Sequence, residues 1–156
     1  MTRWGVGPKI FLLTVVYSAL IWIITRVSPD IFSFWKDGPL ARVRFWAGAV
    51  LIPLGLVQWI VSAATVMRGF TEGRLCTGGV YRLCRHPLYS SWAVFIVPGI
   101  ALVIGNWLAF TVSLFICAVL KRLVRAEEDY LEAKFGEDYR NYRNRTPQIL
   151  PLGWLK

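Results

Sequence analysis

Acidic residues are scarce in this sequence, and charge of either sign is sparse. The 156-residue chain has 9 Asp and Glu against 18 Lys and Arg, and charged residues make up 17% of it. Soluble domains carry about 25% charged and about 45–50% apolar residues. Here 56% are hydrophobic, which excludes a disordered chain and argues against a soluble enzyme. In a membrane protein, the net charge of +9 indicates cytoplasmic loops and anionic headgroups rather than nucleic acid.

Cysteine and histidine are also few, which argues against a metal site or a disulfide framework. The three cysteines, Cys76, Cys84 and Cys117, include no C-x-x-C pair. The single histidine, His86, has no metal-ligating neighbour at helical spacing. We therefore expect neither a bound metal nor structural disulfides. The chain also lacks a G-x-G-x-x-G motif, which argues against a dinucleotide cofactor.

The apolar residues form runs that predict membrane-spanning helices. Residues 87–120 carry no charge, and one helix of that length would be about 50 Å long, too long for a hydrocarbon core of about 30 Å. Gly105-Asn106 in its middle predicts a turn. We therefore expect an all-α integral membrane bundle, a single domain over residues 1–156, with a C-terminal helix and tail in the cytoplasm. The four expected spans are about 10–26, 45–67, 87–104 and 107–123, the last two forming a hairpin.

The distribution of positive charge predicts the orientation of these spans. No small-x-small cleavage site follows the first run, so we interpret it as an uncleaved anchor. With both termini in the cytoplasm, 14 of the 18 Lys and Arg residues lie on the inner side, as the positive-inside rule requires. This orientation places the loop before residue 87 and the C-terminal tail on the same cytoplasmic face, where they can form one site.

The first segment whose residues could form a binding or catalytic site is residues 77–89. Pro87 suits the first position of a helix, and it disfavours helical geometry at the preceding His86. His86 and the adjacent Arg85 would then lie at a helix N-terminus, where an anion such as a carboxylate or phosphate is stabilised. The alternative is a juxtamembrane loop whose arginines contact lipid phosphates.

The second segment is residues 127–147, where acidic residues meet an apolar helical face. Helical spacing places Glu127 on a stripe with Val124 and Leu131, and Glu128 lies about 100° away around the helix. A carboxylate at a membrane boundary is costly unless it meets a cation or a donor. It either binds a ligand or pairs with an arginine, such as Arg85, and so holds the tail to the loop.

Together the two segments resemble the isoprenylcysteine carboxyl methyltransferase family, and more broadly the membrane methyltransferases that include phospholipid methyltransferases. The resemblance rests on G-G-V-Y-R-L-C-R-H-P-L-Y at 78–89, E-E-x-x-L at 127–131 and F-G-x-x-Y-x-x-Y at 135–142, separated by a charge-free hairpin. It covers about residues 40–151. It implies that residues of about 76–151 bind S-adenosylmethionine on the cytoplasmic side and that a lipophilic substrate enters from the bilayer.

The resemblance also implies roles for individual residues. Tyr81, His86 and Tyr89 would help to hold the cofactor, and Glu127 and Glu128 would be its acidic pair. The full expected cofactor set is Tyr81, Arg85, His86, Pro87, Tyr89, Asn106, Glu127, Glu128, Tyr139 and Tyr142. The candidates for catalysis are Glu128, Arg140 and Arg143, the arginines as partners of an acceptor carboxylate.

The identity of the methyl acceptor is open at this stage. An isoprenylcysteine-type carboxylate, phosphatidylethanolamine, a small thiol and another isoprenoid all fit. The expected partners are membrane lipids and a substrate that is either a lipophilic small molecule or prenylated. A carboxylate acceptor needs only a cation, whereas an amine or thiol needs a proton acceptor such as His86 or a glutamate. Two other functions remain as alternatives, an NADPH-dependent membrane reductase of related architecture and a non-enzymatic membrane scaffold.

Overall fold

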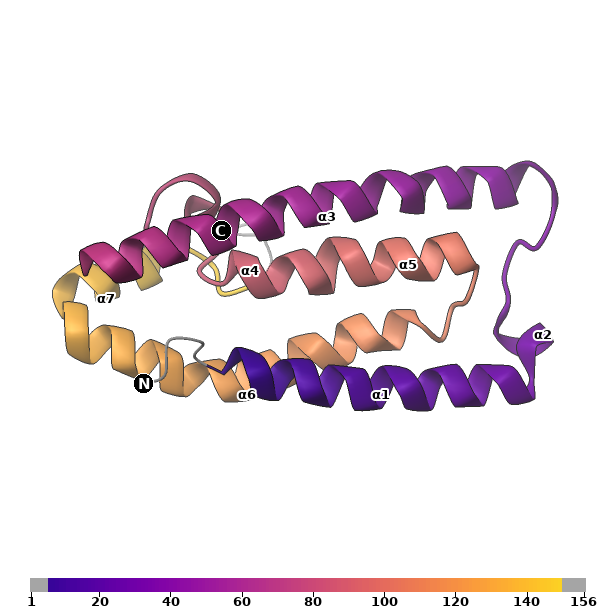
Figure 1. The fold of residues 1–156 in the computed structure, drawn as a ribbon, viewed down its shortest axis with the longest axis horizontal. Coiled ribbons are helices and arrows are strands. Elements are labelled where there is room, and N and C mark those ends of the chain that lie inside the picture. Colours follow the sequence, from indigo (N-terminus) through magenta and orange to yellow (C-terminus); the bar gives the residue numbers. More distant parts are fainter. Residues whose placement is uncertain (1–5, 150–156) are drawn as a thin grey trace.

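Apolar runs bounded by Gly, Pro and charged residues fold into helices along this chain. A computed structural model describes residues 6–149, and it confirms the expected all-α membrane bundle. The elements in chain order are α1 (Gly7–Val27), α2 (Pro29–Phe32), α3 (Gly38–Glu72), the 3₁₀ turn η1 (Gly79–Arg82), α4 (Pro87–Ser90), the π-helical turn η2 (Ser91–Ile96), α5 (Val97–Ile104), α6 (Phe110–Phe135) and α7 (Glu137–Arg145) (Figure 1).

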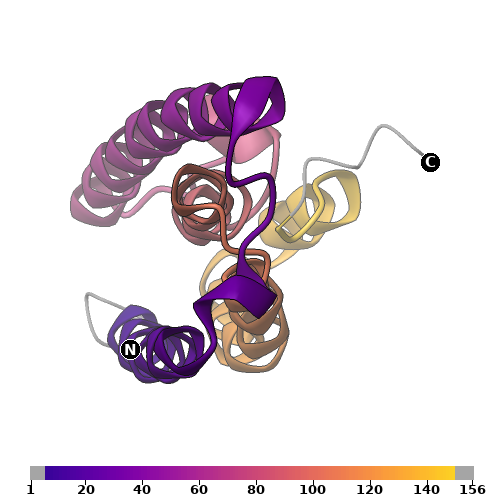
Figure 2. The same cartoon turned by 90° about the vertical axis from the view of Figure 1, so that its right-hand side faces the viewer.

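The long helices run side by side in an elongated bundle (Figure 1). α3 packs along α4, η2 and α5, and α1 packs along α6. Viewed end-on, the two pairs form two layers that meet between α5 and α6, and α7 lies to one side (Figure 2). The end of α3, the start of α4 and the end of α6 lie towards one end of the bundle, and α2 lies at the other (Figure 1). The loop before α4 and the C-terminal segment therefore share one end.

Three helices within residues 6–149 are long and apolar enough to cross a membrane, namely α1, α3 and the continuous segment Pro87–Ile104. Many large apolar side chains on α1 and α3 are exposed in the bundle, as lipid-facing side chains are. α6 differs because Lys121, Arg122 and Arg125 lie near its middle. The protein is an integral membrane protein, and the fourth span at residues 107–123 stays a prediction.

α3 is longer than the span of residues 45–67 that we expected inside it. Its 35 residues correspond to about 52 Å at 1.5 Å per residue, so polar turns extend it at both ends. The helix continues through Pro53. It ends at Gly73, whose left-handed φ of 64° lets its N–H bond back to the last turn.

A stripe of small residues forms the buried face of α3. Its four members recur every seven residues and are Gly48, Gly55, Ser62 and Gly69. A Cβ added at Gly48 would lie 2.5 Å from the carbonyl oxygen of Gly99, and one at Gly55 would lie 2.6 Å from Ile96 Cγ1. The close approach of α3 to α5 and η2 therefore requires these glycines, as in many membrane helix pairs.

The third apolar helix contains a π turn, η2, between α4 and α5. Ser91, Ala93 and Ile96 are buried in this turn, and η2 packs against both α3 and α6. The wider π turn changes which faces of the helix point inward. One helix can therefore pack against both α3 and α6.

The connection from α5 to α6 lies at the opposite end from the loop before α4. α5 ends at Gly105, which has a left-handed φ of 70°, and the turn expected at Gly105-Asn106 is present. The Arg44 guanidinium on α3 donates to the Leu102 and Val103 carbonyls. Arg44 thereby supplies a charged donor to carbonyl groups at the C-terminal end of a helix.

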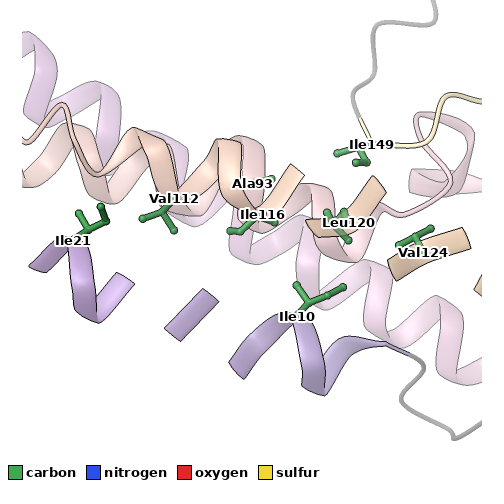
Figure 3. Close-up of a cluster of buried hydrophobic side chains, with 8 residues drawn as sticks. All are labelled: Ile10, Ile21, Ala93, Val112, Ile116, Leu120, Val124 and Ile149. Atoms are coloured by element: carbon green, nitrogen blue, oxygen red, sulfur yellow. The ribbon is translucent and has the colours of Figure 1, made fainter. Parts of the chain in front are cut away.

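The buried apolar cluster joins α1, η2, α6 and the C-terminal segment (Figure 3). Its members are Ile10, Ile21, Ala93, Val112, Ile116, Leu120, Val124 and Ile149. Tyr17 of α1 stacks on Phe115 of α6 with ring centroids 4.3 Å apart. The presence of Ile149 in this cluster fixes the chain just after α7 against α6.

Candidate functional site

The loop before α4 has the geometry that proline imposes. Pro87 is the first residue of α4, and His86 before it is non-helical, with φ −124° and ψ 60°. The backbone N–H groups of Arg85 and His86 donate to the carbonyls of Pro147 (2.8 Å) and Gln148 (3.1 Å). The loop is therefore held by the segment that follows α7.

Glu128 lies at the centre of the site. It is 7% exposed, and its Oε1 lies 3.2 Å from both Arg85 Nη1 and His86 Nε2. The Gln148 side-chain amide also donates to this oxygen, at 3.3 Å. Burial alone would raise the pKa of Glu128, but the bond to His86 and the charge of Arg85 outweigh it and lower that pKa below its usual value. Glu128 is therefore ionised at neutral pH.

Glu127 has the opposite electrostatic character. Its side chain is half-buried, and its Oε2 atom is buried with no hydrogen-bond partner in the described part of the chain. Burial raises the pKa of Glu127, and the neighbouring charge of Glu128 adds to this effect. The proximity of His86 and the hydroxyl of Tyr89 opposes it in part. Two adjacent carboxyl groups thus have pKa values displaced in opposite directions.

Three tyrosines surround these groups. The Tyr142 hydroxyl donates to the Tyr81 carbonyl at 2.7 Å, and the Tyr81 hydroxyl donates to the Ser62 carbonyl of α3 at 3.3 Å. Tyr139 is 1% exposed, and its hydroxyl has no hydrogen-bond partner within residues 6–149. Burial, together with the charge of Glu128, raises the pKa of Tyr139 to about 12. These contacts fasten α7 to the loop and to α3.

The structure brings together most of the residues assigned to the cofactor, but not all of them. Asn106 lies in the α5–α6 turn, where its Oδ1 accepts from the backbone N–H groups of Leu108 and Ala109. The helix from Pro87 to Ile104 separates it from His86 by 18 residues, or about 27 Å. The assignment of Asn106 to the cofactor site is therefore corrected.

Arg140 and Arg143 also lie outside the buried cluster. Their guanidinium groups contact Glu132, at 3.0 Å from Arg140 Nε and 2.8 Å from Arg143 Nη1, and their side chains are 59% and 47% exposed. In this structure they neutralise Glu132 on the outer surface rather than leaving a cation free for a substrate. The alternative interpretation, a glutamate that pairs with Arg85, applies to Glu128.

Sequence reasoning missed two residues of this site, Gln148 and Ser62. The seven-residue recurrence of small residues on α3 is a signal that could have identified Ser62 as buried. Gln148 has no such signal, because it follows Pro147 in a segment without periodicity. Only the return of the chain towards Glu128 identifies it.

The unpaired polar atoms of the cluster fit the amino-acid end of S-adenosylmethionine. Two buried donors of Arg85, Nε and Nη1, lack a hydrogen-bond partner in the described residues, since Nη1 approaches Glu128 without hydrogen-bonding alignment. The unpaired Oε2 of Glu127 is a buried acceptor. A carboxylate and an ammonium group would satisfy these atoms. Within residues 6–149, no group of three or more His, Cys, Asp or Glu side chains is arranged to hold a metal.

Comparisons with known proteins show the family to which the chain is similar. The family model described as phospholipid methyltransferase matches residues 43–138. The nickel-cobalt-cadmium resistance protein NccN of Alcaligenes xylosoxydans xylosoxydans is 32% identical over 97% of this chain and 66% of its own length. Protein-S-isoprenylcysteine O-methyltransferase of Schizosaccharomyces pombe is 32% identical over 64% of this chain and 47% of its own length.

A third relative extends the range of named acceptors. Methanethiol S-methyltransferase of Crocosphaera subtropica is 32% identical over 86% of this chain and 57% of its own length. The chain thus spans about half to two thirds of the length of these relatives. No solved structure matches the chain significantly. The similarity to isoprenylcysteine methyltransferases that the motifs indicate is confirmed, and because the family model covers more than half of the chain, this protein belongs to the phospholipid methyltransferase family.

Proposed function

We propose that this protein is an S-adenosylmethionine-dependent methyltransferase of the membrane, acting on a lipophilic acceptor. The observation that carries the proposal is the joining of Arg85 and His86 to Glu127 and Glu128. These pairs are 42 residues apart in sequence, yet they form one buried cluster with unpaired donors and an unpaired acceptor. Membership of the family supports the same conclusion.

Each residue of the cluster has a role in this proposal. Arg85 binds the carboxylate of the amino-acid end, with the positive end of the helix dipole at Pro87 adding to it. Glu127 and Glu128 bind the ammonium group and hydroxyl groups of the cofactor. The rings of Tyr81, Tyr139 and Tyr142 form apolar walls, and an aromatic face also stabilises a sulfonium.

The cofactor supplies an electrophilic methyl group, and the residues of this chain supply position and a dry environment. Methyl transfer in line between two heavy atoms depends mainly on orientation and on the exclusion of water. The burial of Glu128, Tyr139 and His86 provides such an environment. A carboxylate acceptor is ionised at neutral pH and needs no base.

We propose an isoprenylcysteine-type carboxylate as the first acceptor to test, because several similar proteins are named as isoprenylcysteine O-methyltransferases. A thiol is the second candidate, favoured by the methanethiol S-methyltransferase that matches 86% of the chain. A thiol must lose its proton, and Glu127, whose pKa is raised, lies next to His86 as an acceptor for it.

We further propose that this end of the bundle faces the cytoplasm. Residues 68–86 and 121–156 together carry 12 of the 18 Lys and Arg residues, and cytoplasmic segments of membrane proteins are enriched in these residues. A cysteine-accessibility assay in oriented vesicles tests this. Single cysteines at Arg82 and at Lys36 should label from opposite sides.

The decisive experiment is cofactor binding to the purified full chain in detergent. Wild-type protein should bind radiolabelled S-adenosylmethionine, and Glu128→Gln should reduce binding at least tenfold because the ionised group is lost. Glu137→Gln is the matched control, since it makes the same chemical change at an exposed position. Absence of binding in folded wild-type protein would overturn the proposal. Transfer of the labelled methyl group to S-farnesylcysteine, methanethiol or phosphatidylethanolamine then identifies the acceptor.

A further inference from the structure

The segment after α7 forms a third wall of the site. α7 ends at Arg145, and Thr146 is 8% exposed. Pro147 and Gln148 then accept hydrogen bonds from the backbone of the loop before α4. Ile149 is 6% exposed and belongs to the apolar cluster that contains Leu120 (Figure 3). The segment is thus anchored on both sides of Gln148.

Gln148 itself reaches the central carboxylate. Its side-chain Nε2 donates to Glu128 Oε1 at 3.3 Å, while its backbone carbonyl accepts from the backbone N–H of His86 at 3.1 Å. Arg85 and His86 contact the same Oε1 atom, each at 3.2 Å. Three side chains therefore converge on one oxygen of Glu128, and no hydrogen bond within residues 6–149 engages the other oxygen, Oε2.

We propose that Gln148 is a positioning residue that orients Glu128 towards the ligand. The two groups on the loop, Arg85 and His86, come from adjacent residues and both contact Oε1. The amide of Gln148 comes from a different segment and fixes the rotation, which leaves Oε2 available to a donor group of the cofactor. This inference rests on the proposed function, because the orientation matters only if Glu128 binds the cofactor.

The first test replaces the amide by an apolar group of similar size. Gln148→Leu should raise the Kd for S-adenosylhomocysteine about tenfold, the loss of one hydrogen bond to a charged group. It should raise the KM for the cofactor while kcat stays within about twofold of wild type, because the residue positions a binding group. Asn144→Leu is the matched control, an amide replaced on the exposed face of α7. Unchanged binding in Gln148→Leu would overturn the inference.

The second test separates positioning from a merely structural role. Gln148→Glu places a carboxyl group against Glu128. At pH 8 both groups are charged and repel. Lowering the pH to 5.5 favours protonation of the introduced group, because the adjacent Glu128 anion raises its pKa, and its O–H can then donate to Oε1 as the amide did. The other titratable or charged groups around it, from α6, from the loop and from α7, are Glu127, Arg85, His86 and Tyr139.

The affinity of Gln148→Glu for S-adenosylhomocysteine, divided by the wild-type affinity at the same pH, should rise at least fivefold when the pH is lowered from 8 to 5.5. The corresponding ratio for Gln148→Leu should not change, and dividing by wild type removes the titration of the surrounding groups. A ratio for Gln148→Glu that is independent of pH would contradict the proposal. If wild-type protein binds no cofactor, the proposed function fails and this inference with it; if wild type binds and neither variant is affected, the positioning role alone fails.

Discussion

Glu127 and Glu128 are adjacent, yet the same substitution should change stability in opposite directions. Glu128→Gln removes the anion that lies between Arg85 and His86, whose side chains are 12% and 5% exposed. Losing a hydrogen-bonded charge there costs about 2 kcal/mol. For a chain of this length, this lowers the melting temperature by about 4–8 °C.

Glu127→Gln removes a charge that burial opposes. The Oε2 atom of Glu127 is buried and unpaired, so an uncharged amide in its place should stabilise the protein by about 1 kcal/mol. The melting temperature should rise by about 2–4 °C. Cofactor binding should nevertheless weaken, because the acceptor for a cationic group becomes neutral. A variant that is more stable but binds less well is the mark of a residue placed for function.

The pH dependence of the two effects provides an internal check. The pKa of Glu127 is raised in the folded state, so its favourable contribution is present below the unfolded value of about 4.5 and is lost as pH rises through the folded value. The gain in Glu127→Gln should therefore grow with pH. The pKa of Glu128 is lowered, so the defect in Glu128→Gln should shrink as pH falls below about 4.5.

Thermal unfolding of the detergent-solubilised protein between pH 4 and pH 8, followed by intrinsic tryptophan fluorescence, measures both effects. The exposed Glu137→Gln is the reference variant and should stay within about 1 °C of wild type. If Glu127→Gln and Glu128→Gln both destabilise at pH 7, then Glu127 makes structural contacts, and the assignment of its unpaired oxygen to a ligand is refuted.

Three further predictions concern the elements around the site. Gly55→Leu should lower stability by about 1–3 kcal/mol in a thermal-unfolding assay because η2 lies too close, whereas Gly78→Ala, with open space and negative φ, should have little effect. Tyr142→Phe should cost about 1 kcal/mol, through loss of the bond to Tyr81, and speed proteolysis after α7. Arg143→Gln should change stability by less than about 0.5 kcal/mol and leave cofactor affinity unchanged in the binding assay; a large loss would restore Arg143 to the site.

The helices were predictable wherever apolar residues run without charge. The turn at Gly105 followed from the length of the uncharged run 87–120, because the bilayer limits the length of a span. The ends of α3 were not predictable in this way. Its terminal turns are polar, so the apolar run that predicts the helix covers only residues 45–67. The helical hydrogen bonding nevertheless continues from Gly38 to Glu72.

The site was predictable only in part, because motifs specify residue types and not their partners. The proximity of Arg85 to Glu128 was one of two open interpretations, and the structure combines it with unpaired donor and acceptor atoms that a ligand would satisfy. The exposed pairing of Arg143 with Glu132 depends on how α7 folds back after Gly136. The role of Gln148 depends on a tail that returns to the loop. Such tertiary contacts leave no periodic signal in a single sequence.

The π turn η2 determines the rotational setting of the site relative to the membrane part. Towards its C-terminal side, Gly99 meets the small-residue stripe of α3, and towards its N-terminal side, His86 meets Glu128. A π turn contains one residue more than an α-helical turn, which corresponds to a rotation of about 100°. Deleting one residue from Ser91–Ile96 would yield a regular helix that satisfies only one of the two contacts. The π turn therefore sets the rotation of the loop before α4 relative to α5. A single insertion or deletion within it would change that rotation, and with it the alignment between the loop and the membrane-spanning helices.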